Sequence, residues 1–171
     1  MRSAEAEFAA LFEEQYGRVL RYAQRRITDA EVACELANEC FAIAWAKFDP
    51  AHPITLPWLF QTARHLLANE YRRSARSKDA MRWMAELSVT GPELDDLIEV
   101  SMALDRLSDD DRELVRLTYW EGLSAVEAGR TLGLSDGAVK VRLTRARARL
   151  RELLEGRRAV TIRRGSAREV G

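Results

Sequence analysis

Apolar residues recur along this chain at intervals of three and four, the spacing of one face of an α-helix. The first series predicts a helix over residues 8–27. Thr28 and Glu31 then have the spacing of a capping box, which predicts the start of a second helix that continues to about residue 48. A third helix is expected over residues 57–73, because the proline at its first position suits a first helical turn.

The second half of the chain repeats this pattern after a stretch in which it weakens. A helix is expected over residues 94–107, followed by Ser108 as the N-cap of a helix that opens with three aspartates and ends at Gly122. Carboxylates in the first turn interact favourably with the helix dipole, so their role is interpreted as structural. Strand-like alternation is scarce throughout. The sequence therefore predicts an all-α protein.

The pattern divides the chain into two small helical domains. They are expected at residues 1–74 and 92–155, joined by a flexible linker at residues 75–91. Residues 156–171 form a basic tail that is too polar to pack alone, and we expect this tail to be disordered.

Residues 123–150, LSAVEAGRTLGLSDGAVKVRLTRARARL, predict two helices joined by a tight turn. The first ends at Gly133, which can adopt the left-handed conformation that a sharp turn requires. Ser135 then stands at the N-cap position, so the second helix is expected to begin at Asp136. This pattern indicates a helix-turn-helix whose second helix is rich in cations.

The second of these helices has two different sides. An apolar stripe is expected to face the core and comprises Val139, Leu143, Ala146 and Leu150. Small residues bordered by cations on the other side suit a recognition helix in the DNA major groove, with the cations near phosphates. The predicted duplex-binding residues are Ser135, Gly137, Lys140, Val141, Arg142, Thr144, Arg145 and Arg149. The alternative is a solvated basic helix packed on a neighbour.

Composition narrows the class of protein. The 27 Lys and Arg residues balance the 27 Asp and Glu residues, but glutamates concentrate near the start and arginines beyond Lys140, which suits different partners at the two ends. No apolar run is long enough for membrane insertion and no signal peptide is evident, so a cytoplasmic protein is expected. Cys34 and Cys40 have no metal-ligand spacing and are interpreted as core thiols. We expect no metal, cofactor or small-molecule substrate.

Two helical domains in this order, the second with a basic helix-turn-helix, resemble the extracytoplasmic-function (ECF) group of bacterial RNA polymerase sigma factors. The resemblance covers about residues 5–74 and 94–154, and is most specific in ALDRL at 103–107, EGLS at 121–124, LGLS at 132–135 and the matching positions of 139–147. It implies a subunit that confers promoter recognition and initiation on core RNA polymerase. It also implies an anti-sigma factor as a partner.

The resemblance implies roles for the first domain as well. Residues 33–41, ACELANECF, are similar to the acidic helix that docks on core RNA polymerase, and the implied contacts are Glu35, Leu36, Asn38 and Glu39. Residues 58–73 are similar to the helix that captures the melted promoter element, where unpaired bases need aromatic and polar groups beside cations. The implied contacts are Phe60, Arg64, His65, Asn69, Arg72 and Arg73. Trp58 and Phe60 have the alternative of being plain core residues.

Two positions of the helix-turn-helix depart from the family pattern. Ala128 and Gly129 stand where isoleucine and alanine are common. Loss of the isoleucine is expected to thin the core beneath the recognition helix, and to destabilise the second domain by about one to a few kcal/mol unless neighbours fill the gap.

An ECF sigma factor without catalytic activity is therefore the leading hypothesis. The alternative is a stand-alone helix-turn-helix repressor or activator, whose N-terminal domain binds a ligand or dimerises. That alternative predicts tight operator binding without core polymerase. A nuclease is disfavoured, because the chain has only His52 and His65 and no carboxylate cluster suited to a two-metal site.

Overall fold

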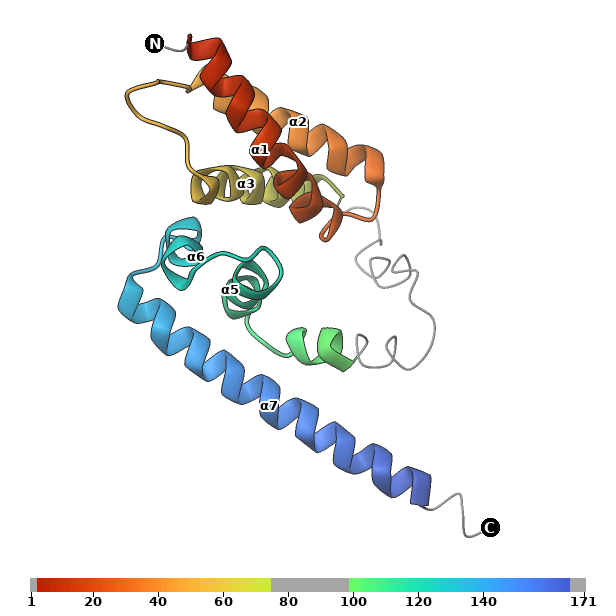
Figure 1. Ribbon diagram of the computed structural model, residues 1–171. Coiled ribbons are helices and arrows are strands. Elements are labelled where there is room, and N and C mark those ends of the chain that lie inside the picture. The colour runs from red at the N-terminus through yellow and green to blue at the C-terminus, as the bar shows by residue number, and fades with distance from the viewer. Residues whose placement is uncertain (1–2, 75–98, 167–171) are drawn as a thin grey trace. The chain divides into compact units, whose positions relative to one another are not determined.

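The computed structural model describes residues 3–74 and 99–166, and helices dominate both parts (Figure 1). Apart from one isolated β-bridge between Asp49 and His52, these described residues contain no strand. The chain divides into two compact units, Met1–Ser88 and Val89–Gly171. The predicted all-α class is confirmed, while the predicted linker at residues 75–91 lies outside the described residues.

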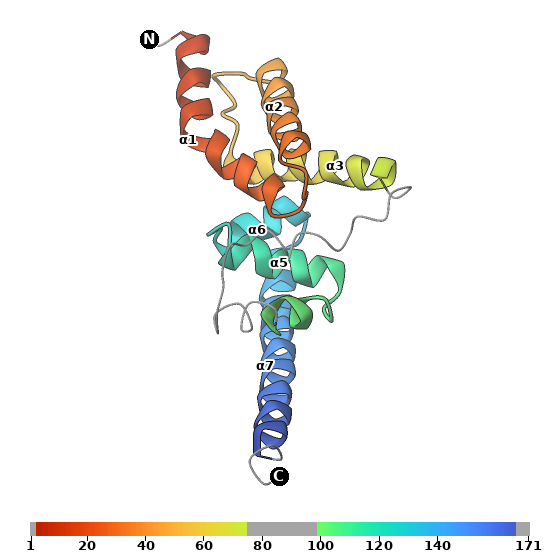
Figure 2. The ribbon, with the colours of Figure 1, turned by 90° about the vertical axis from the view of Figure 1, so that its right-hand side faces the viewer.

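The first unit contains α1 (Ala4–Gln24), α2 (Ala30–Ala46) and α3 (Leu56–Ser74). The first two helices lie side by side, and α3 crosses one end of the pair (Figures 1 and 2). Their apolar faces meet in a core that includes Val19, Tyr22, Leu36, Cys40, Phe41, Leu59, Phe60 and Leu67. This burial supplies the main favourable term in folding of the unit.

The start of α2 differs slightly from the prediction. Asp29, not Thr28, is the N-cap, and its Oδ1 accepts hydrogen bonds from the backbone N–H groups of Glu31 at 2.9 Å and Val32 at 3.3 Å. Both residue types can cap a helix, but an ionised carboxylate also interacts favourably with the positive end of the helix dipole.

The two cysteines of this unit have different surroundings. Cys40 is fully buried and its thiol donates to the carbonyl oxygen of Leu59 over 3.5 Å. Burial raises the pKa of this thiol to about 12, because a thiolate would lose its hydration. Cys34 is only half-buried, with its sulfur 3.9 Å from the Tyr16 hydroxyl. The interpretation as core thiols is right for Cys40 and only partly right for Cys34.

The second unit contains a helical stretch over residues 99–104, then α5 (Asp109–Tyr119), α6 (Ala125–Leu132) and α7 (Asp136–Ser166). Ser108 is the N-cap of α5, as predicted, and its hydroxyl oxygen accepts from the N–H of Asp111 at 3.3 Å. Helix α7 packs against both α5 and α6. The core between them includes Leu104, Leu107, Leu114, Val115, Leu117, Leu123, Val139 and Leu143.

Helix α7 is longer than the sequence pattern predicts. It runs to Ser166, whereas the sequence pattern places the start of a polar tail at residue 156. A glycine inside a helix costs only about 1 kcal/mol, and arginine is a good helix former, so Gly156 alone does not end the helix. No helix in the described parts of the chain is long and apolar enough to cross a membrane.

Gly129 lies where α6 and α7 approach closely. A Cβ atom built on it would be 2.6 Å from Cγ2 of Val139 and 3.2 Å from the carbonyl oxygen of Leu134. The first distance is shorter than real contacts allow. There is therefore no gap beside Gly129, because the Val139 side chain occupies the space that an alanine methyl would need.

We expect Gly129→Ala to lower the unfolding free energy of the second unit by about 1–3 kcal/mol, since overpacking moves a stiff β-branched side chain and backbone. This outweighs the gain of about 1 kcal/mol that alanine has over glycine in a helix. Urea unfolding followed by circular dichroism measures the change. Gly137→Ala is the matched control, because nothing lies within 4 Å of its Cβ position and it should be neutral or stabilising. Equal stability of the two variants would contradict the steric argument.

Candidate nucleic-acid interface

Side-chain caps stand at the start of both helices of the helix-turn-helix in the second unit. The Ser124 hydroxyl oxygen accepts from the N–H of Glu127 at 3.2 Å, and Glu127 Oε2 accepts from the N–H of Ser124 at 2.8 Å. Gly133 then takes a φ of 67° at the end of α6. The Ser135 hydroxyl oxygen accepts a 3.3 Å hydrogen bond from the first turn of α7. The turn and the start of α7 are as predicted.

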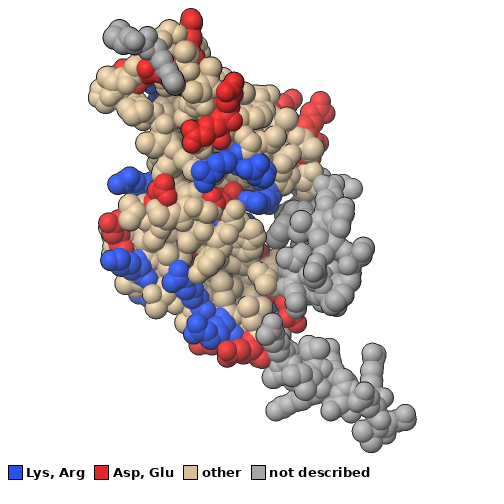
Figure 3. All heavy atoms as spheres, in the orientation of Figure 1, with Lys and Arg blue, Asp and Glu red and all other residues tan. Residues whose placement is uncertain are grey.

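Helix α7 presents different chemistry on its two sides. Val139, Leu143 and Ala146 are buried, and Leu150 is half-buried, so the predicted core stripe is confirmed. The opposite side is exposed and carries Gly137, Lys140, Val141, Thr144, Arg145, Ala148 and Arg149. Figure 3 shows Lys and Arg side chains along the visible face of the second unit. This surface combines small side chains at its centre with cations beside them.

The predicted duplex-binding cations differ in whether they form ion pairs within the fold. Arg142 is half-buried and pairs with Asp110 over 3.4 Å and with Asp111 over 3.6 Å, which ties α7 to the start of α5. Arg149 pairs with Glu152 over 3.3 Å. Lys140 and Arg145 make no ion pair within the described part of the chain. Neither of these two side chains has to break an ion pair with a described residue to reach a ligand.

Helix α3 of the first unit buries one of its predicted ligand contacts. Phe60 has no exposed surface, and its ring centroid lies 4.9 Å from that of Tyr22. The prediction that Phe60 contacts a melted promoter strand is therefore wrong, because the ring is part of the core. His65, Asn69, Arg72 and Arg73 are exposed and Arg64 is half-buried.

The exposed side of α3 includes an aromatic residue, Trp58, that is not among the implied DNA contacts. Trp58 is half-buried and stands seven residues before His65, a spacing that places both on one side of the helix. Further along the same side, Arg72 donates to Asn69 Oδ1 over 2.7 Å. Arg73 pairs with Glu70. The spacing of seven was available in the sequence and would have identified Trp58.

Helix α2 carries an acidic outer face. Glu35, Asn38 and Glu39 are exposed, and Asn38 Oδ1 accepts a 2.8 Å hydrogen bond from the Tyr16 hydroxyl. Leu36 is only 5% exposed, so its prediction as a docking contact is wrong. One residue rotates a helix by about 100°, which turns Leu36 from the outer face into the core.

Aromatic side chains continue this face toward the end of α2. Trp45 is 48% exposed, seven residues after Asn38 and therefore on the same side of the helix. Its ring lies 4.9 Å from Phe8 and 6.3 Å from Phe48, measured between centroids.

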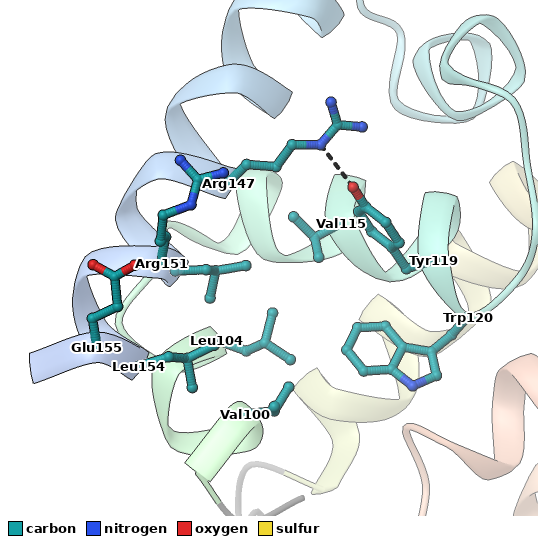
Figure 4. A pocket seen from close by; sticks show the side chains of 10 residues that line it. Val100, Leu104, Val115, Tyr119, Trp120, Arg147, Arg151, Leu154 and Glu155 are labelled. Atoms are coloured by element: carbon teal, nitrogen blue, oxygen red, sulfur yellow. Dashed lines mark hydrogen bonds between the residues drawn. The ribbon is translucent and has the colours of Figure 1, made fainter. Parts of the chain in front are cut away.

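The second unit also has an apolar groove of about 540 Å³ between α5, the later turns of α7 and the stretch before α5 (Figure 4). At its rim, Arg147 Nε donates to the Tyr119 hydroxyl over 2.7 Å. Trp120 is 41% exposed. The apolar lining comes from Val100, Leu104, Val115, Tyr119, Trp120, Leu150 and Leu154. Helix α7 thus offers an outward cationic surface near its start and an apolar groove wall farther along.

Both units match models of known protein families. Residues 11–77 match the model described as Sigma-70 region 2, and residues 97–150 match Sigma-70, region 4. The chain is 34% identical to the ECF RNA polymerase sigma factor SigL of Mycobacterium tuberculosis, over 85% of this chain and 88% of that protein. It is also 34% identical to the probable RNA polymerase sigma factor RfaY of Xanthomonas campestris pv. campestris, over 93% of this chain. The match spans 45% of the RfaY chain.

Two solved structures are similar to most of the chain. One is CnrH in complex with the cytosolic domain of CnrY, with a TM-score of 0.59, 29% identity, and coverage of 87% of this chain and 88% of CnrH. The other is the sigma factor RpoE with the anti-sigma factor NepR from Bartonella quintana. It has a TM-score of 0.60, 28% identity, and coverage of 86% of this chain and 96% of RpoE.

Proposed function

The chain belongs to the ECF group of bacterial RNA polymerase sigma factors, and we propose that its first unit docks on core RNA polymerase while its second unit recognises promoter duplex. Sigma factors are transcription initiation factors and not enzymes. In the proposal, residues 1–74 serve docking and promoter melting, and residues 92–155 read the duplex element. The protein would act in the cytoplasm, where the polymerase and its promoters are.

One observation carries the DNA-binding part of this proposal. The side of α7 opposite its buried stripe is lined with small residues and flanked by Lys140 and Arg145, which have no internal ion pair among the described residues. Small side chains let a helix backbone approach base edges, while long cations reach phosphates or guanine. Arg142 is proposed to hold α7 against α5, and so to act on DNA through the position of the helix.

The exposed side of α3 is the proposed site for melted promoter DNA. Bases that leave a duplex can stack on aromatic rings and contact polar groups, while cations lie near the backbone. Trp58 supplies an aromatic ring, and His65 and Asn69 supply polar groups. Arg72, farther along the helix, supplies a cation. Trp58 replaces Phe60 as the proposed stacking residue, because Trp58 has exposed surface and Phe60 has none.

The outer face of α2 is the proposed docking surface for core polymerase. Its carboxylates suit a basic partner, and Trp45 adds apolar area beside them. An anti-sigma factor is the proposed regulator, since CnrH and RpoE were each solved with such a protein or a cytosolic domain. The apolar groove beside Trp120 is a second candidate surface for a protein partner.

In-vitro transcription tests the proposed function. Purified core RNA polymerase is incubated with a library of genomic fragments, with and without the protein. Specific initiation from a subset of fragments is expected only when the protein is present. A stand-alone regulator would instead bind its operator tightly by itself and would leave the start sites of core polymerase unchanged. That result would overturn the proposal.

A further inference from the structure

Val141 is an apolar side chain that the fold leaves on the outside of α7. It is 48% exposed and lies opposite the buried stripe of Val139, Leu143 and Ala146. A β-branched residue restricts its own χ1 in a helix and is a weaker helix former than alanine. In this position Val141 neither contributes to the core nor stabilises the helix through its intrinsic propensity. Its placement therefore favours a role at the outer surface.

The residues around Val141 make this part of the surface poor in hydrogen-bond donors. Gly137 has no side chain, and nothing lies within 4 Å of its Cβ position. The Thr144 hydroxyl donates to the carbonyl oxygen of Lys140 over 2.8 Å, so its hydrogen is engaged by the backbone. Ala148 continues the same side one turn later. The strip formed by Gly137, Val141, Thr144 and Ala148 is thus small and largely apolar, between cations.

The major groove of DNA offers one apolar group on its base edges, the C5 methyl of thymine. We infer that Val141 reads the methyl group of a thymine in the duplex promoter element. This inference rests on the proposed function and specifies its ligand. Arg145, four residues later on the same helix, would supply a polar contact to a neighbouring base pair.

Replacing thymine by uracil tests the contact between Val141 and the methyl group by itself. Uracil pairs with adenine as thymine does and lacks only the methyl group. A promoter found by transcription with the reconstituted holoenzyme is prepared with each thymine of its upstream duplex element replaced, one at a time, by deoxyuridine. Competition binding of the holoenzyme is then measured on each duplex. At one or two positions we expect about fourfold weaker binding, the effect of about one buried methyl group.

The variant Val141→Ala should bind the thymine and uracil duplexes equally at those positions. Val126→Ala is the matched control, because Val126 is a 41% exposed valine on α6 and its replacement should keep the discrimination. The inference is overturned if no position responds to uracil, or if Val141→Ala keeps the same fourfold ratio as the natural protein. Absence of transcription from every genomic fragment would instead overturn the proposed function, and this inference with it.

Discussion

Glu35→Lys combined with Asn38→Ala is expected to abolish binding to core RNA polymerase, with at least about a hundredfold loss of affinity. Both residues lie on the exposed face of α2, and the lysine would bring a positive charge to a surface proposed to meet a basic partner. Like charges placed together across an interface cost several kcal/mol. Equilibrium binding of the labelled full-length protein to purified core enzyme measures the loss.

A charge-matched control separates docking from general electrostatics. Glu14→Lys makes the same charge change on an exposed residue of α1, on the side of that helix away from Phe12 and Tyr16, which lie near Phe41 of α2. This control should keep its affinity. Circular dichroism should show both proteins folded, since the Asn38 change removes only the Tyr16 hydrogen bond. Full transcription by the double variant would refute the assignment of the docking face.

Arg145→Ala should weaken recognition of the promoter duplex by about 1–3 kcal/mol while leaving core binding intact. Arg145 is exposed at the edge of the small-residue strip and has no ion pair within the described residues. A guanidinium in this position can donate two hydrogen bonds to one guanine. Holoenzyme binding to the cognate duplex, and to duplexes with one base pair changed, measures both affinity and discrimination.

Two further variants identify the kind of contact. Arg145→Lys keeps the charge and loses the planar fork, so a base contact predicts reduced discrimination and a phosphate contact predicts little change. Arg106→Ala removes an exposed cation outside the recognition helix and should leave the affinity nearly unchanged. Uniform weakening on all sequences, with a smaller salt dependence, would show that Arg145 contacts phosphate instead of a base.

The sequence predicted the helix-turn-helix accurately because its signals are local. Gly133 and Ser135 determine where one helix ends and the next begins, through backbone freedom and a hydroxyl group, and the structure places both as expected. The buried stripe of α7 was predictable for a related reason. Regular spacing on one helix determines which residues share a side, whatever the neighbouring elements are.

Single residues at the borders of the helix faces were predicted less well. Phe60 and Leu36 are chemically compatible with either a ligand surface or a core. The packing of the helices decides in favour of the core, where Phe60 lies against Tyr22 and Leu36 is buried. Arg142 is another such case, since its carboxylate partners come from a helix more than twenty residues earlier in the chain. Local pattern does not specify such contacts between helices.

The amino-acid sequence by itself determined the helical class, the caps of α5 and α7, the apolar sides and the likeness to a family, because each depends on residues a few positions apart. Only the tertiary structure decided which borderline side chains are buried and which cations are engaged. It also decided that Gly129 must be small and that Val141 is left outside. Those properties depend on how closely helices approach one another, a distance set by the packing of all their side chains together.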